Sequence, residues 1–116
     1  MINPTVGRKV WYRPGNHDTA GRGGMQVASG QPLDATVLAV WGPTCVNLQV
    51  LDIVGKPFTI TSCRLLQDGE EPPRGPAKPD GTPGDIIGGY AEWMPYQNAQ
   101  AAKQAREDAA APVVAQ

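Results

Sequence analysis

Histidine, cysteine and phenylalanine are scarce in this chain, and no strong excess of either charge is present. The 116 residues include one histidine, two cysteines and one phenylalanine, and the formal net charge is −1. A conventional structural zinc site needs four Cys or His ligands at close spacing, so we expect no metal site and no cofactor. The near-neutral charge also disfavours a general nucleic-acid coat held by phosphate contacts.

Long hydrophobic runs are missing as well. No apolar stretch approaches the roughly 20 residues that span a bilayer, and residues 1–9 lack the apolar segment of a signal peptide. We therefore expect no membrane association and a cytosolic location, in which Cys45 and Cys63 stay reduced. A meander centred near Val54 would place these two thiols opposite each other on neighbouring strands, on the polar side, where a disulfide is the alternative to two free thiols.

Glycine and proline are abundant, with 14 and 12 residues. They concentrate in residues 68–89, where eleven of 22 residues are Gly or Pro and most others are charged. Such a segment buries too little apolar surface to offset its ordering entropy, so we expect a long excursion, which binding to a partner could order. The length allows one compact domain: a β-barrel domain in residues 1–94, followed by a helix and tail in residues 95–116.

Short strands separated by turn residues dominate the first 94 residues. Val46, Leu48 and Val50 alternate with polar residues, which indicates a strand with one buried face. A short strand is also conceivable at residues 25–28. The pattern predicts a mostly β fold, a small half-open barrel of SH3-like type with an OB-like barrel as the alternative. Its strands would be Arg8–Arg13, Asp34–Trp41, Cys45–Asp52, Pro57–Cys63 and Tyr90–Met94, with a three-stranded meander over residues 34–63.

The end of the chain predicts a helix. Pro95 suits a helix N-terminus, the alanine-rich residues 96–111 have high helix propensity, and Pro112 would end it. Because alanine supplies little apolar area, this helix either packs lightly or docks on another subunit.

Several motifs, taken together, resemble small accessory proteins of tailed bacteriophages. These proteins often contain G-R-x-V-x-Y, then V-W-x-x-x-x-V-N-L, then a T-S strand, and one branch ends in E-W-M-P-Y-Q. The resemblance covers about residues 4–67 and 88–104, and departs from the shorter relatives in the long Gly/Pro insertion. It implies a phage accessory protein with a small β-barrel, and it assigns no activity and no functional residue. The matching residues here are Gly7, Arg8, Val10, Tyr12, Val40, Trp41, Val46, Asn47, Leu48, Thr61, Ser62 and residues 92–97.

Aromatic and basic residues form the most informative set. Trp11 and Tyr12 are adjacent on one strand and must face opposite sides, and Tyr90 and Trp93 also have opposite parity. Rings beside guanidinium groups suit a ligand with both a base and a phosphate; the competing interpretation is that the rings fill a core or a subunit interface. The predicted ligand-binding residues are Arg8, Trp11, Tyr12, Arg13, Arg22, Tyr90 and Trp93.

Two further segments carry weaker signals for a functional site, the loop around His17 and residues 21–24. His17 lies in the loop sequence Asn16-His17-Asp18, and a catalytic triad would require an acid and a nucleophile gathered from mobile loops, so a solvated loop residue is the favoured interpretation. Residues 21–24, Gly-Arg-Gly-Gly, could cradle a phosphate through backbone N–H groups, although they lack the Lys-Ser/Thr of a P-loop. A flexible loop is the simpler interpretation.

These patterns predict a binding protein without enzymatic activity. The favoured hypothesis is a phage-encoded protein that sequesters a small anionic, nucleotide-type immune signal of its host, in the host cytoplasm and in a pocket between protomers of a homo-oligomer. One alternative is a structural or assembly protein of the virion. The other is a nucleic-acid-binding barrel, which the acidic pI of about 5.7 disfavours.

Overall fold

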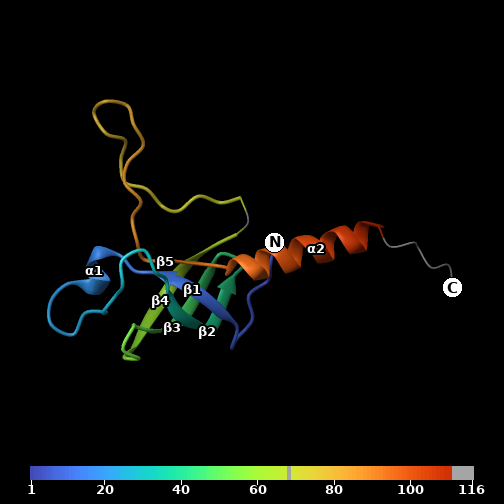
Figure 1. Cartoon of the computed structure of the whole chain (residues 1–116), viewed down its shortest axis with the longest axis horizontal. Coiled ribbons are helices and arrows are strands. Elements are labelled where there is room, and N and C mark those ends of the chain that lie inside the picture. The colour runs from blue at the N-terminus through green and yellow to red at the C-terminus, as the bar shows by residue number, and fades with distance from the viewer. Residues whose placement is uncertain (68, 111–116) are drawn as a thin grey trace.

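The protein is a small closed β-barrel that carries two projecting segments (Figure 1). The computed structural model describes residues 1–67 and 69–110. The strands pair in chain order around the barrel, β1-β2-β3-β4-β5, and β5 closes it by pairing with both β1 and β4. The elements are β1 (Lys9–Arg13), α1 (Asn16–Thr19), β2 (Leu33–Gly42), β3 (Cys45–Leu51), β4 (Pro57–Leu66), β5 (Tyr90–Glu92) and α2 (Pro95–Ala110).

The predicted mostly β fold with a C-terminal helix is confirmed, but the barrel is closed rather than half open. The consecutive strand order has no Greek-key connection, the feature that characterises the OB fold. Several local predictions differ from the structure: residues 25–28 form no strand, β4 continues to Leu66 instead of ending at Cys63, and β5 ends at Glu92 instead of Met94. The predicted end of the helix at Pro112 lies outside the described residues.

Alternation along the strands builds the core. Val46, Leu48 and Val50 of β3 are fully buried, while the residues between them are exposed or half-buried. The loop between α1 and β2 adds Met25, which is 4% exposed and packs in the same cluster. The other members of this core are Val10, Tyr12, Leu33, Ala35, Val37, Cys63, Leu65, Ala91 and Trp93.

Three register shifts disturb the pairing near Asn47, two between β2 and β3 and one between β3 and β4. Leu38 of β2 is skipped between Val37↔Leu48 and Ala39↔Asn47, and β4 also shifts register opposite Asn47. This shift places Cys63 opposite Val46, facing the core, and Cys45 opposite Arg64. The prediction that the two cysteines face each other on the polar side is therefore wrong, and both thiols are free.

The Gly/Pro-rich segment connects β4 to β5, which run parallel. Parallel neighbours need a long crossover, and residues 67–89 supply it. Most of the segment projects from the barrel as a narrow finger, residues 73–87 (Figure 1). Its two arms are joined by backbone hydrogen bonds, Gly75 N–H to Asp85 O at 2.9 Å and Ile87 N–H to Pro73 O at 2.7 Å. The finger thus has internal backbone hydrogen bonds of its own.

The α2 helix is attached to the barrel at its first turn. Gln97 is 6% exposed, and its side chain accepts the Met94 N–H at 2.8 Å and donates to Lys9 O at 2.9 Å. The rest of the helix extends away from the barrel (Figure 1). Among the described residues, no helix is long and apolar enough to cross a membrane.

Candidate functional site

The structure divides the seven predicted ligand residues into buried and accessible groups. Tyr12, Tyr90 and Trp93 are 0%, 7% and 3% exposed. Tyr12 and Trp93 belong to the core cluster, whereas Tyr90 is buried outside it. Trp93 does not face outward, because the chain leaves the strand after Glu92 and turns the indole inward. Trp11 is half-buried, as its parity opposite Tyr12 predicts, and Arg8 and Arg22 are exposed.

The predicted pairing of rings with guanidinium groups is present at two places. The Arg8 guanidinium lies 5.5 Å from the centroid of Trp93 and covers this buried ring from outside. The Arg13 guanidinium lies 5.6 Å from the centroid of Trp11. Arg22, by contrast, lies in an exposed turn and is not stacked on an aromatic ring of the described residues.

Arg13 is the best-positioned of the basic residues. Its Nε donates to Glu92 Oε1 at 2.8 Å, and its Nη1 donates to Gly30 O at 3.3 Å. Since a guanidinium has five N–H donors, these contacts fix its orientation and leave further donors for another acceptor. Its side chain remains 31% exposed. It lines a hollow of about 230 Å³ together with Pro14 and the loop residues 27–31.

A larger cleft of about 520 Å³ adjoins this hollow, because Pro14 lines both. One wall is residues 14–17, at the start of α1, and the other is the base of the finger, residues 85–88. Gly15 and Gly88 bring the walls together: a Cβ atom on Gly88 would lie 2.2 Å from Pro14 O and 2.5 Å from Gly15 Cα. The two walls can approach this closely because position 88 has no side chain.

A buried polar network supports the α1 wall. The Tyr12 hydroxyl, inside the core, donates to Asp18 Oδ2 at 2.6 Å, and the same oxygen accepts the Gly15 N–H at 2.9 Å. His17 Nε2 lies 3.3 Å from the other carboxylate oxygen of Asp18. Burial and the bond to Asp18 raise the pKa of Tyr12, so this phenol stays protonated and keeps donating. The network fixes the turn that presents Asn16 and His17 to the cleft.

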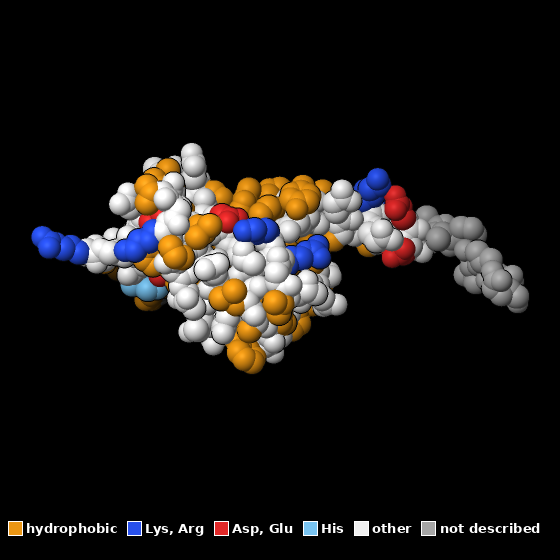
Figure 2. Space-filling view, turned by 90° about the horizontal axis from the view of Figure 1, so that it is seen from below, with side chains coloured by type: hydrophobic (Ala, Val, Ile, Leu, Met, Phe, Trp, Pro, Cys, Tyr) orange, Lys and Arg blue, Asp and Glu red, His pale blue; other side chains and the backbone are white. Residues whose placement is uncertain are grey.

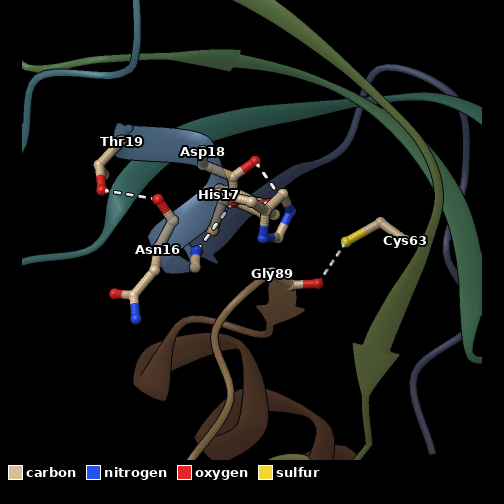
Figure 3. A network of polar contacts seen from close by, with 8 residues as sticks. Asn16, His17, Asp18, Thr19, Cys63 and Gly89 are labelled. Carbon is tan, nitrogen blue, oxygen red and sulfur yellow. Dashed lines mark hydrogen bonds and ion pairs between the residues drawn. The ribbon is translucent and has the colours of Figure 1, made fainter. Parts of the chain in front are cut away.

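The other side of this network contains a thiol. Figure 3 shows the His17 ring beside Asp18 and near Gly89, with the Cys63 sulfur directed at the Gly89 carbonyl, 3.9 Å away. Burial raises the pKa of Cys63 to about 12. A thiol with that pKa is almost entirely protonated at neutral pH and is a poor nucleophile. Cys63 therefore acts as a small core residue here.

Sequence reasoning missed the residues that shape the cleft. Asp18 looked like an ordinary loop acid, and Gly88 looked like one of many flexible glycines. Nothing local marks Asp18, because its role depends on its contact with Tyr12 on another element. The role of Gly88 depends on its contact with Pro14, which is distant in the sequence. The Gly88-Gly89-Tyr90 sequence directly before a strand is the one available signal.

Residues 21–24, for which a phosphate cradle and a flexible loop were the two interpretations, form a tight turn. The Gly24 N–H points back to Gly21 O, at 3.4 Å, and a Cβ atom on Gly24 would lie 2.7 Å from Thr19 O. Gly24 thus serves close packing against the end of α1. Its amide is already engaged within the loop.

Comparison of the chain with protein-family models, with curated proteins and with solved structures finds no match.

Proposed function

We propose that this protein binds a small anionic molecule and does not transform it chemically, using the cleft and the Arg13 hollow on either side of Pro14. The observation that carries the proposal is the state of Arg13. Its guanidinium is oriented by Trp11, Glu92 and Gly30 and borders an open hollow. An oriented guanidinium with spare donors suits a carboxylate or phosphate group.

The cleft fits the less polar part of such a ligand. Ile86 and Ile87, each about half exposed, line it together with Pro14, and Asn16 and His17 add polar groups. Ligand sites typically combine apolar walls with a few placed polar groups. The two hollows together would accommodate a molecule with an acidic group at one end and a ring or sugar at the other.

The chemistry near the cleft favours binding over catalysis. His17 and Asp18 form a pair of the kind that activates a nucleophile. However, the thiol on the far side of this network, Cys63, has a pKa of about 12, and the Thr19 hydroxyl donates back to Asn16 O at 3.2 Å. Neither group is prepared to attack a substrate.

The specific form of the proposal is sequestration of a nucleotide-type signal. It draws on the resemblance to phage accessory proteins and on the adjacent ring and guanidinium of Trp11 and Arg13. A protein that only holds such a signal needs affinity and no turnover. The oriented guanidinium of Arg13 and the hollows on either side of Pro14 would contribute to such affinity.

A thermal-shift screen of mononucleotides, cyclic oligonucleotides and inorganic phosphate, followed by calorimetry, tests the proposal. A true ligand stabilises the folded state by mass action, and Arg13→Gln should weaken its binding about tenfold or more. Arg106→Gln, on exposed α2, is the matched control and should leave binding unchanged. Stabilisation below roughly 1 °C across the whole screen would count against an anion site.

The cleft has its own test. Gly88→Ala cannot be accommodated against Pro14 O, so it should separate the finger base from α1 and abolish ligand binding. Gly42→Ala is the control, because a Cβ atom there meets nothing within 4 Å. Equal binding by both variants would remove the cleft from the site and leave only the Arg13 hollow.

A role in virion assembly is the second candidate, and the projecting finger and α2 favour it. Both segments extend from the barrel (Figure 1), and arms of this kind commonly become ordered on neighbouring subunits. Finding the protein in purified virions would support this role. Its restriction to the early phase of infection would contradict it.

A further inference from the structure

One buried hydrogen-bond donor of the barrel is left without a partner. The indole of Trp93 is 3% exposed, and its Nε1 is the one buried side-chain nitrogen or oxygen that lacks a hydrogen-bond partner among the described residues. Arg8 lies over the same ring, but a guanidinium has only donors and cannot accept the indole N–H. Buried donors without an acceptor are rare in folded proteins, because the hydrogen bond lost to water is not replaced.

This indole lines a hollow of about 170 Å³, which we call the Trp93 hollow. Its walls come from the ends of the parallel strands β4 and β5, from the first turn of α2 and from the start of the crossover. Leu66 and Pro72 add apolar surface to these walls. Because the unpaired donor belongs to a residue that borders an open space, a bound molecule can supply the missing acceptor.

The charges at the Trp93 hollow are balanced. Two carboxylates line it, those of Glu70 and Glu92. Arg13 Nε donates to Glu92 Oε1 at 2.8 Å, and Arg64 forms an ion pair with Glu70. A cationic ligand would find both carboxylates already paired, whereas an anionic ligand would lie beside two like charges. The hollow therefore favours an uncharged ligand.

The side chain of Asn98 indicates which uncharged group fits. Asn98 lies in the first turn of α2 and lines the Trp93 hollow. Its carboxamide has an acceptor oxygen beside a donor nitrogen. A carboxamide or lactam of a ligand can pair with both atoms, and its carbonyl oxygen has a second lone pair for the Trp93 N–H.

A second hollow, of about 220 Å³, continues from the first, because Gln67 and Asn98 line both. Its other walls are Met1, Ile2 and three alanines of α2. Figure 2 shows hydrophobic side chains gathered where α2 leaves the barrel. Gln67 is held in place at this junction, since its Nε2 donates to Ile2 O at 2.8 Å and to Pro43 O at 2.7 Å. The second hollow thus suits an apolar substituent of the ligand.

We propose that the Trp93 hollow binds an uncharged small molecule that carries a carboxamide or lactam group and an apolar substituent. The carbonyl oxygen of this molecule accepts the Trp93 N–H, its amide group pairs with Asn98, and its substituent lies against the alanines of α2. This inference does not depend on the anionic site at Arg13, which involves another ligand chemistry.

Titration with benzamide, followed through the indole N–H signals in the proton–nitrogen NMR spectrum, tests the proposal. The chain has three tryptophans, so Trp11 and Trp41 are internal controls, and Trp11→Phe and Trp41→Phe assign their signals. Benzamide should shift the Trp93 signal most. Benzoate, which has a similar shape but carries a charge and no N–H, should bind at least tenfold more weakly.

Three results of this titration would overturn the proposal. The Trp93 signal would stay unchanged in benzamide at tens of millimolar, or it would move equally with benzoate. The third is a cross-peak from the Trp93 N–H to water that benzamide does not remove, because a bound water would then be the acceptor.

A pair of variants on α2 tests the role of the carboxamide. Asn98→Ala should raise the dissociation constant of benzamide about tenfold, because it removes the group that pairs with the ligand. Gln100→Ala is the matched control, since Gln100 is exposed on the same helix and lines neither hollow. Circular dichroism checks that both variants remain folded. Equal affinity of the two folded variants for benzamide would contradict the pairing with Asn98.

Discussion

Backbone hydrogen bonds connect the strands within the barrel and the two arms within the finger, but different interactions stabilise the two regions. The barrel encloses fifteen buried hydrophobic residues, and none of them comes from the finger. The finger instead depends on backbone contact: a Cβ atom on Gly84 would lie 2.2 Å from Gly75 O. Its two large apolar residues, Ile86 and Ile87, are about half exposed.

The comparison explains how a rigid framework can carry an adaptable site. Segments with few buried apolar contacts open locally at a low free-energy cost, whereas a core opens only with global unfolding. One wall of the cleft is attached to the barrel core, and the other belongs to the finger. The α1 wall is attached to the core through Tyr12 and Asp18, and the finger base forms the other wall. We expect the finger side to adjust when a ligand enters.

The two regions should differ most in how much free energy of unfolding is lost when an apolar side chain is truncated to alanine. Leu65→Ala removes a fully buried side chain of β4 and should lower the free energy of unfolding by about 2–5 kcal/mol. Ile86→Ala, in the finger, should lower it by less than about 0.5 kcal/mol. Urea unfolding followed by tryptophan fluorescence measures both. A similar loss in the two variants would mean that the finger belongs to the cooperative core.

Acid should act on the barrel through Asp52, at the β3–β4 turn. Desolvation raises the pKa of this carboxyl, but hydrogen bonds from the N–H groups of Gln26, Lys56 and Val54 outweigh it and hold the pKa below its usual value. A depressed pKa stabilises the folded state above the unfolded value, and that stability is lost as the pH falls through the folded value. The wild type should therefore lose stability below about pH 4.

Asp52→Asn provides the control for this acid effect. The amide cannot titrate, so the free energy of unfolding of this variant should be lower near neutral pH and should fall less steeply below pH 4. Parallel pH profiles for the variant and the wild type would assign the acid sensitivity to other carboxyls. Unfolding in urea at a series of pH values gives both profiles.

The finger can be opened without disturbing the barrel. Gly84→Ala should separate the two arms, while Gly75→Ala, whose Cβ atom would meet nothing closer than 3.8 Å, should preserve them. We expect hydrogen exchange of the Gly75 and Ile87 amides to accelerate at least tenfold in Gly84→Ala only. Global unfolding should change by less than about 1 kcal/mol in both variants. A large global loss in Gly84→Ala would show that the arms support the core.

The last prediction concerns the chemical reactivity of the two cysteine thiols in the folded protein. Cys63 is 3% exposed with a pKa of about 12, so about one molecule in ten thousand carries its thiolate at pH 8. Cys45 is half-buried and faces outward. Iodoacetamide at pH 8 should therefore label Cys45 in the folded protein and Cys63 only after unfolding, as peptide mass spectrometry would show. Equal labelling of both would contradict the buried position of Cys63.

The sequence was sufficient for the parts governed by local pattern. The meander of β2, β3 and β4 follows from alternation and turn residues, and the position of α2 follows from Pro95 and the alanine content. The opposite facing of Trp11 and Tyr12 follows from strand geometry alone. These features depend on neighbours within a few residues.

The remaining features depend on contacts between distant residues. The bulges around Asn47 shift the register, so counting from the turn placed Cys63 on the wrong face. The cleft depends on Gly88 meeting Pro14, and no spacing along the chain encodes that contact. Of the predicted ligand residues, the burial of Tyr90 and Trp93 depends on how β5 enters the barrel between β1 and β4.

The position of β5 also determines the order in which the chain can assemble. The strand that closes the barrel pairs with β1, and the residues it joins, Arg13 and Tyr90, are far apart in sequence. Such distant pairing carries a large loop-closure entropy and slows folding. During synthesis, the first four strands would form an open, curved sheet, which cannot close until β5 leaves the ribosome. A chain cut within the finger would still hold all five strands, so two fragments of this protein should recombine into one barrel.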